Sequence, residues 1–210
     1  MHPSDVELKS VDVPQVKNWY SRGYLPHLDH PGLIQFITFR LADALPAEVI
    51  ARLRLCAPDG AHYAEAVQEH LNAGHGECLL RLPAHARIVQ DALLHFDGQR
   101  YRLLAWVLMP NHVHVLVETQ PAHSMSAIVH SWKSFTAKAI NQALERQGTL
   151  WQREYFDRYI RDERHLQAVI DYIDNNPVKA GLVQLASDWR FGSARLNASQ
   201  EGAPAPRRQP

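Results

Sequence analysis

The sequence has little cysteine, no long apolar run and no apparent export signal, and each of these shortages excludes a class of protein. Its only cysteines, Cys56 and Cys78, are far apart and form no CxxC pair. Neither a disulfide framework nor a cysteine-based zinc site is therefore expected. No apolar stretch approaches the roughly 18 residues of a membrane span, and the N-terminal MHPSDVELKSVDVP lacks the basic start and apolar core of a signal peptide. We expect a cytoplasmic protein that does not bind membranes.

Net charge and glycine-rich loops are also missing. The 22 basic and 22 acidic side chains cancel, so the net charge does not point to a nucleic-acid partner. The sequence contains no phosphate-binding loop of the Walker or dinucleotide kind, which argues against ATP-driven chemistry, nicotinamide redox and a nucleotide cofactor. A chain of 210 residues, 46% of them hydrophobic, can form one sizeable core. A single domain is therefore expected.

Four segments have the composition of strands. Residues 32–41 (GLIQFITFRL) are rich in β-branched and aromatic residues. Residues 101–109 (YRLLAWVLM) and 112–119 (HVHVLVET) are apolar and are separated by a Pro-Asn pair. This pair is typical of a hairpin, so two adjacent antiparallel strands are predicted. Residues 150–161 (LWQREYFDRYIR) are predicted to form a short strand or an extended segment.

Helical patterns occupy most of the remaining chain. We predict an interrupted helical insertion at about 44–80, helices at 83–96 and 124–148, and a final amphipathic helix that ends before Pro177. This order predicts an α+β fold, in which helices pack on one face of an antiparallel sheet of the ferredoxin-like or RRM-like kind. The polar, proline-rich residues 197–210 cannot bury enough apolar surface to fold and are expected to be a disordered tail.

The predicted strand at 112–119 carries His112 and His114, two residues apart. Because side chains alternate along a strand, both imidazoles point to one face while the intervening valines point to the other. We expect the valine face to pack on the helices, which leaves the histidines on an open face of the sheet. Two adjacent imidazoles can bind one divalent cation, although inert surface histidines can have the same spacing.

The final predicted helix places a phenol beside an amide. Its apolar side chains repeat at helical spacing from Leu166 to Ile173, and Tyr172 and Asn176, one turn apart, lie together on one flank of this stripe. The two groups could belong to a site at the border of core and solvent. A structural role is also open, in which Tyr172 packs its ring and Asn176 helps to end the helix.

Four stretches taken together resemble the single-tyrosine transposases of the HUH endonuclease superfamily. They are MPNHVHVLV, SWKSFTAKAIN, LWQREYFDRYIRDERHL and YIDNNPVKAGLV, in the order found in that family. The chain is most similar to the bacterial REP-associated tyrosine transposases, and RGYLPHLDHPGLIQFITFRL resembles their N-terminal stretch. The resemblance extends from Arg22 to Leu196. It implies one HUH-type catalytic domain over residues 1–196 and a bacterial, nucleoid-associated protein.

The resemblance also implies a role for each matching residue. His112 and His114 correspond to the two histidines of the HUH motif, and Tyr172 corresponds to the nucleophilic tyrosine of the final helix. Asn176 falls where the family places a third, amide-type metal ligand. Relatives often have Gln at this position, and Asn is one methylene shorter.

The implied reaction is cleavage and transfer of single-stranded DNA, often beside a hairpin such as a repetitive extragenic palindrome. Attack by Tyr172 on the scissile phosphate would form a 5′-phosphotyrosine and free a 3′-hydroxyl, with Mg²⁺ or Mn²⁺ as cofactor. The covalent intermediate retains the energy of the phosphoester bond, in agreement with the missing nucleotide-binding loop. Tyr155 and Tyr159 are second candidates for the nucleophile, because neither has an amide one turn away.

We expect the open face of the sheet to hold the DNA strand through aromatic rings and cationic side chains. The candidate stacking rings are those of Trp132, Trp151 and Tyr155, and the candidate phosphate contacts are Lys133, Lys138, Arg153, Arg158 and Arg161. Each of these side chains could instead be a core ring or part of a solvated helix face.

Two other functions also agree with the sequence. One is a metal-dependent phosphoesterase in which the histidines and a water act and Tyr172 is only structural. The other is an inactive, sheet-based module for single-stranded nucleic acid, although such a platform would carry aromatic residues in place of the paired histidines. The family includes monomers and domain-swapped homodimers with the tyrosine acting in trans, so both oligomeric states are compatible with the sequence.

Overall fold

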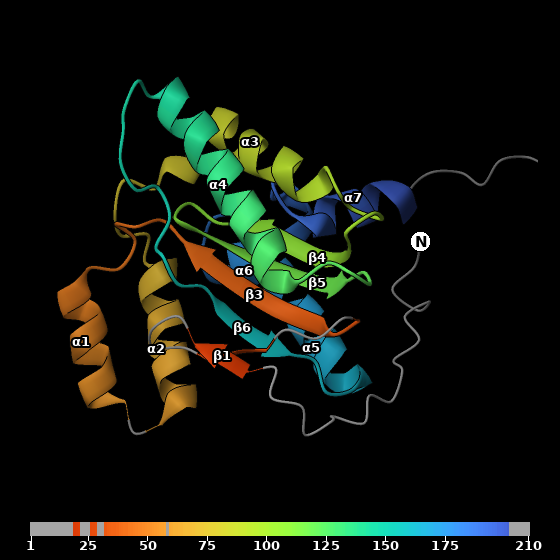
Figure 1. The fold of residues 1–210 in the computed structure, drawn as a ribbon, viewed down its shortest axis with the longest axis horizontal. Coiled ribbons are helices and arrows are strands. Elements are labelled where there is room, and N and C mark those ends of the chain that lie inside the picture. Colours follow the sequence, from red (N-terminus) through yellow and green to blue (C-terminus); the bar gives the residue numbers. More distant parts are fainter. Residues whose placement is uncertain (1–18, 22–25, 29–31, 58, 202–210) are drawn as a thin grey trace, which may run out of the picture.

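A four-stranded antiparallel sheet forms the centre of the protein, which we describe from a computed structural model (Figure 1). The structure describes residues 19–21, 26–28, 32–57 and 59–201. The strand order is β4-β5-β3-β6, and every neighbouring pair is antiparallel. The bounds of these strands are Ile34–Arg40 for β3, Tyr101–Leu108 for β4, His112–Thr119 for β5 and Phe156–Tyr159 for β6. A separate two-stranded sheet pairs β1, Trp19–Ser21, with β2, Pro26–Leu28.

The helices agree with the periodicity of the sequence and begin where their capping residues indicate. Pro83 is the first residue of α3, and the Ser124 and Asp162 side chains cap α4 and α5 by accepting hydrogen bonds from the Ala127 and His165 amides. The longer helices are α1 Ala47–Cys56, α2 Gly60–Asn72, α3 Pro83–Leu94, α4 Met125–Ala143, α5 Glu163–Asp174 and α7 Ser193–Glu201. A single turn, α6 at Asn176–Lys179, directly follows α5.

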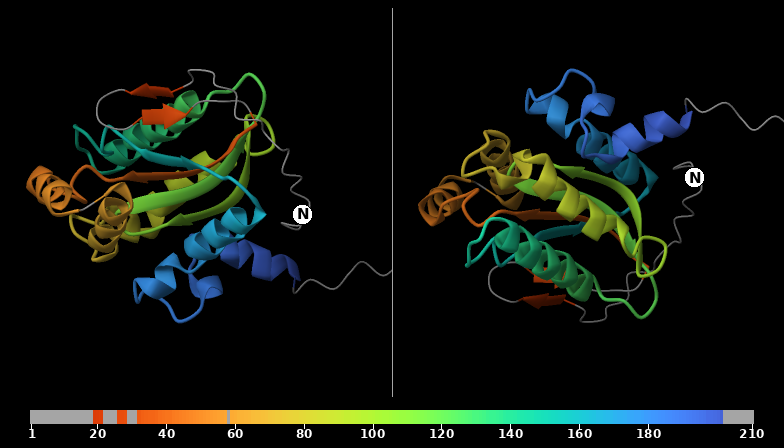
Figure 2. Two further views of the ribbon diagram at one scale, coloured as in Figure 1. Left: turned by 90° about the horizontal axis from the view of Figure 1, so that it is seen from below. Right: turned by 90° about the horizontal axis from the view of Figure 1, so that it is seen from above.

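The helices α3 and α4 cover one face of the sheet (Figure 2). The three valines of β5, Val113, Val115 and Val117, lie in the core cluster on this face together with side chains of α3 and α4. The expectation that the valine face packs on helices is therefore confirmed, and so is the hairpin of β4 and β5.

The opposite face, which carries the histidines, is not open as the sequence suggested. The apolar stripe of α5, represented by Leu166, Ile170 and Ile173, packs on Leu116 of β5 and Val107 of β4. In both views of Figure 2 the sheet lies between α3 and α4 on one side and α5 to α7 on the other. Helix α5 thus covers the face of the sheet that was expected to hold a DNA strand, because the apolar stripe of this helix requires a buried surface.

The helices α1 and α2 form the insertion that the sequence predicts at about 44–80. They lie beside the sheet, where β3 ends (Figure 1). Leu71 of α2 is buried in the main core and Val67 packs against it, whereas α1 has no buried residue. The insertion is therefore attached mainly through α2.

The segment after α6 returns to the free edge of β4. The Leu108 amide donates to the Phe191 carbonyl at 2.9 Å, and the Trp106 amide donates to Oγ of Ser193 at 3.0 Å. Because α7 continues to Glu201, the predicted disordered tail from residue 197 begins too early; residues 202–210 lie outside the described residues. No helix in the described ranges is long and apolar enough to cross a membrane.

Candidate active site

The side chains of His112 and His114 meet beneath the surface of the protein. Both residues are fully buried, with 0% exposure. Their ring centroids are 4.7 Å apart, and their Nε2 atoms are 3.2 Å apart. The alternation of the strand thus brings the two imidazoles together as predicted, but in a closed environment.

The hydrogen bonds of Asn111 determine where His112 carries its proton. The Nδ2 group of Asn111 donates to the His75 carbonyl at 3.0 Å, which orients the amide so that its Oδ1 faces Nδ1 of His112 at 2.7 Å. An amide oxygen only accepts, so Nδ1 of His112 must carry the hydrogen. Nε2 of His112 therefore carries the lone pair of the ring, which is what metal binding requires.

His114 has an equivalent support on the neighbouring strand. Its Nδ1 lies 2.7 Å from Oγ1 of Thr38, which is its register partner on β3. Burial lowers the pKa of His114 to about 3 and holds the pKa of His112 well below its ordinary value, with a further lowering by the neighbouring His114. Both imidazoles are therefore neutral at physiological pH and can act as ligands.

The residues present fit a divalent cation. Two nitrogen ligands at about 2.1 Å from one cation lie about 3.0 to 3.4 Å from each other for bond angles of 90 to 109°, and the observed 3.2 Å separation falls in this range. Asn176 is 0% exposed, and neither its Nδ2 nor its Oδ1 has a hydrogen-bond partner. A buried amide without partners is costly. No three His, Cys, Asp or Glu side chains cluster within the described part of the chain.

Tyr172 lies next to this pair in the same chain. Its ring centroid is 5.4 Å from that of His114 and 5.8 Å from that of Phe36, and Phe36 stacks on His114. Burial raises the pKa of the Tyr172 phenol well above its ordinary value, and the nearby Asn176 amide opposes the rise. The ammonium of Lys179 lies 5.4 Å from the Tyr172 ring centroid, in a cation–π contact.

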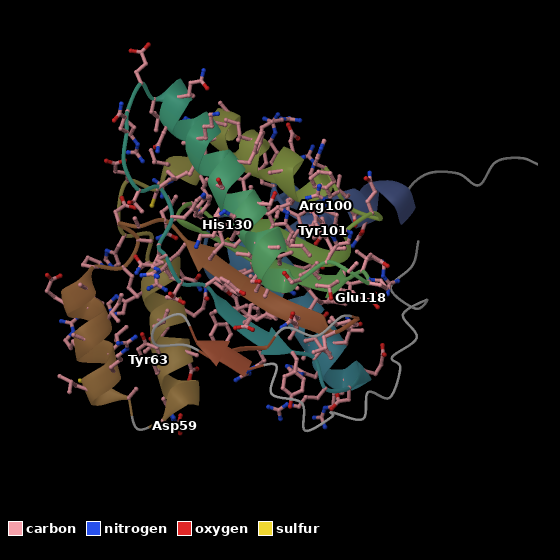
Figure 3. All side chains as sticks on the ribbon, viewed as in Figure 1. Asp59, Tyr63, Arg100, Tyr101, Glu118 and His130 are labelled. Carbon is pink, nitrogen blue, oxygen red and sulfur yellow. The ribbon has the colours of Figure 1, made fainter. Side chains whose placement is uncertain are left out.

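A groove of about 910 Å³ leads from the protein surface to Tyr172. We call it the insertion groove, because α1 and α2 form one wall and β3, β6 and α5 form the other. Tyr63, labelled on α2 in Figure 3, lies in this wall. Gln68 of α2 also lines the groove, and its Nε2 lies 3.2 Å from Nε2 of His112.

The supporting residues of the site were not predicted from the sequence. Asn111 precedes His112 directly, so its position in the motif could have identified it. Thr38 could have been found only from the register of β3 against β5, and Phe36 only from the packing of α5. Gln68 belongs to a helix without a recognisable motif, and no signal in the sequence indicates its contact.

Two of the predicted DNA-binding residues are core residues. Trp132 and Trp151 are 3% and 4% exposed and contact Phe39. The indole of Trp132 donates to the Tyr101 hydroxyl at 2.9 Å, and that of Trp151 donates to Thr136 at 2.9 Å. Both rings are therefore buried, their N–H groups are engaged inside the protein, and neither is available for stacking on bases in this structure.

The remaining predicted contacts are distributed over several surfaces. Tyr155 and Arg158 line the insertion groove. Lys133 is held by two 2.7 Å hydrogen bonds to the carbonyls of residues 152 and 153, so its ammonium has a structural role. Arg153, Arg161 and Lys138 are exposed. The structure thus brings two of these eight residues next to the candidate site.

Comparisons with known proteins show similarity to transposases. Residues 82–176 match the family of IS200-like transposases, a range that contains both histidines, Tyr172 and Asn176. A REP-associated tyrosine transposase of Escherichia coli is 30% identical over 113 residues, which cover 53% of this chain and 66% of that protein. A protein of Haemophilus influenzae classed with the same transposases is 27% identical over 111 residues, which cover 48% of this chain and 63% of that protein.

The overall fold is similar to a solved structure of a REP-associated tyrosine transposase bound to a REP hairpin. The TM-score is 0.60, the identity is 18%, and the match covers 87% of this chain and 88% of the other. The aligned part spans slightly less than two thirds of the two curated relatives. Over residues 82–176 the chain is similar to the IS200-like transposases, and among them to the REP-associated tyrosine transposases.

Proposed function

We propose that the protein is a metal-dependent endonuclease and strand transferase for single-stranded DNA that cuts near hairpins and forms a 5′-phosphotyrosine at Tyr172. The observation that carries this proposal is the 5.4 Å separation of the Tyr172 and His114 rings within one chain. A nucleophile beside a pair of neutral imidazoles is what phosphoryl transfer to a phenol requires.

The chain's own residues supply the parts of the reaction. His112, His114 and Asn176 would hold Mg²⁺ or Mn²⁺, which supplies charge stabilisation at a phosphate oxygen. The Tyr172 oxygen attacks phosphorus after losing its proton, and the bond from phosphorus to the 3′-oxygen breaks. That oxygen leaves as a 3′-hydroxyl after taking up a proton, so one phosphoester replaces another. No nucleotide is consumed, in keeping with the missing Walker loop.

The insertion groove is the proposed path of the DNA. It leads to Tyr172 and is lined by the cationic side chains of Arg40, Arg54 and Arg158. The Nε of Arg40 is buried and meets no hydrogen-bond partner, so a phosphate oxygen would satisfy it. Tyr155, which lines the same groove, remains a proposed stacking ring. A hairpin substrate is proposed from the hairpin-bound relative of similar fold.

The first test is covalent trapping. Labelled single-stranded hairpins and unstructured controls are incubated with the protein and Mn²⁺ or Mg²⁺, and the products are separated on a denaturing gel. We expect a metal-dependent covalent adduct with the wild type and none with Tyr172→Phe, which keeps the ring contacts with Phe36 and His114. Tyr155→Phe and Tyr159→Phe are matched controls that should retain the adduct.

Other results would identify the alternatives. Metal-dependent cutting that survives in Tyr172→Phe and never gives an adduct would establish the phosphoesterase. Binding without cutting of any substrate would establish the inactive module, which has less structural support because α5 covers the histidine face. Loss of the adduct in Tyr159→Phe alone would move the nucleophile to β6.

A further inference from the structure

One polar side chain of the insertion, Gln68 of α2, contacts the histidine pair. Nε2 of Gln68 lies 3.2 Å from Nε2 of His112, the same separation as between the two imidazole nitrogens. The same Gln68 group donates to Oδ1 of Asn72 at 2.8 Å. Gln68 and Asn72 are one turn apart on α2, and both line the insertion groove. Three groups that could bind a metal therefore lie together: the imidazoles of His112 and His114, and the Gln68 carboxamide from the insertion.

Gln68 faces the nitrogen of His112 that carries the lone pair. Because Nδ1 of His112 donates to Asn111, the Nε2 lone pair is the group that Gln68 contacts. A cation bound to this lone pair would have the Gln68 carboxamide as an immediate neighbour. The N–H end of the amide would repel the cation, and the oxygen end would attract it.

A carboxamide can present either end without changing its shape. Half a turn about the last side-chain bond exchanges Oε1 and Nε2. In the turned orientation, Oε1 of Gln68 takes the place 3.2 Å from His112. Asn72, turned in the same way, then donates from Nδ2 to Oε1 and keeps the hydrogen bond between the two amides. A carboxamide oxygen supported by a donor is a suitable ligand for Mg²⁺ or Mn²⁺.

We propose that Gln68 is a further ligand of the divalent cation, supplied by α2. The inference rests on the proposed function to the extent that His112 and His114 hold a metal. The site then joins three parts of the chain: β5 through the two histidines, the turn α6 through Asn176, and the insertion through Gln68. Cation binding consequently fixes α2 against the sheet.

The test measures metal binding by the whole 210-residue chain without DNA. Isothermal titration with Mn²⁺ compares the wild type with Gln68→Met, which removes the ligand atom at similar length, and Gln68→Glu, which restores an oxygen. Gln152→Met is the matched control, since Gln152 lines the same groove without a hydrogen bond to either histidine among the described contacts. We expect Gln68→Met to weaken Mn²⁺ binding about tenfold or more, Gln68→Glu to bind at least as well as the wild type, and Gln152→Met to be unchanged.

Hydrogen exchange gives a second, independent measurement. Mn²⁺ should slow amide exchange in α2 of the wild type but not of Gln68→Met. If Gln68→Met binds Mn²⁺ with wild-type affinity, or if Mn²⁺ does not change amide exchange in α2 of the wild type, Gln68 is not a ligand. Either result would leave the transposase proposal intact. A wild-type chain that binds neither Mn²⁺ nor Mg²⁺ would overturn both. If Gln68→Met lowers the unfolding temperature, Asn72→Leu, which removes the supporting donor, should weaken Mn²⁺ binding in the same way.

Discussion

The chemistry of the site depends on small polar residues that orient larger ones. Asn111 is the clearest example, because a single amide accepts from His112, donates to the His75 carbonyl and is itself fully buried. Its two hydrogen bonds select the tautomer of His112. A buried pair of imidazoles without such supports would have no preferred orientation.

Replacement of Asn111 should therefore affect both stability and metal binding. In Asn111→Ala the Nδ1–H of His112 loses its acceptor, and we expect the free energy of unfolding to fall by about 1 to 3 kcal/mol. Mn²⁺ affinity should fall about 10- to 100-fold. Denaturant unfolding and calorimetric titration measure the two effects. Asn175→Ala, at an exposed amide, is the control; wild-type Mn²⁺ binding by Asn111→Ala would show that His112 is oriented without it.

Individual residues also show where a sequence is informative and where it is not. The spacing of His112 and His114 follows from the alternation of a strand and could be predicted. The roles of Trp132 and Trp151 could not, because an aromatic ring with an N–H group suits a base-stacking surface and a hydrogen-bonded core equally well. Tertiary contacts with Thr136 and Tyr101 decide in favour of the core.

At the scale of elements, α5 carries Tyr172 to the histidines. Its first turn is fixed by Asp162, whose side chain accepts from the His165 amide at 2.8 Å. Its apolar stripe is held by Leu116 and other residues on the histidine face of the sheet. The position of the phenol therefore depends on a cap ten residues away in the sequence.

Loss of that cap should loosen the helix. We expect Asp162→Ala to lower the free energy of unfolding by about 1 kcal/mol and to slow formation of the Tyr172 adduct. Asp171→Ala, at an exposed position of the same helix, should change stability by less than about 0.5 kcal/mol. Urea unfolding and the time course of adduct formation provide the comparison. Equal effects of the two variants would show that the cap does not position Tyr172.

The elements themselves were largely predictable, but their arrangement was not. Composition identified β3, the Pro-Asn pair between two apolar segments identified the β4 and β5 hairpin, and helical periodicity together with capping residues identified α3, α4 and α5. Periodicity does not state which helix covers which face of a sheet, and for this reason the histidine face was expected to be open. Likewise, the pattern of α2 predicts a helix, while the contact of Gln68 with His112 depends on how the insertion folds back on the sheet.

At the scale of the whole molecule, one chain contains every residue of the candidate site. The two histidines lie on β5, Tyr172 lies on the helix α5 that packs on the sheet, and Asn176 lies in the adjoining turn α6, so the geometry favours a tyrosine that acts in cis. A domain-swapped dimer would instead combine the tyrosine of one chain with the histidines of another.

Mixing two inactive variants distinguishes these arrangements. Tyr172→Phe and His114→Gln are each expected to form no covalent adduct. A preparation in which the two chains are unfolded and refolded together should also form none if every chain uses its own tyrosine. Refolded wild type is the control for recovery. Adduct formation in the mixture, with the label on the His114→Gln chain, would instead demonstrate a shared site.

Residues 189 to 193, which lie along the edge of β4, have a consequence for the synthesis of the protein. The hydrogen bond between Trp106 of β4 and Ser193 connects residues 87 positions apart in the sequence. A nascent chain therefore completes β4 and β5 long before the residues that cover the β4 edge have left the ribosome. During that interval the β4 edge lacks the hydrogen bonds that Phe191 and Ser193 supply in the folded chain, and an uncovered strand edge is open to pairing with other chains.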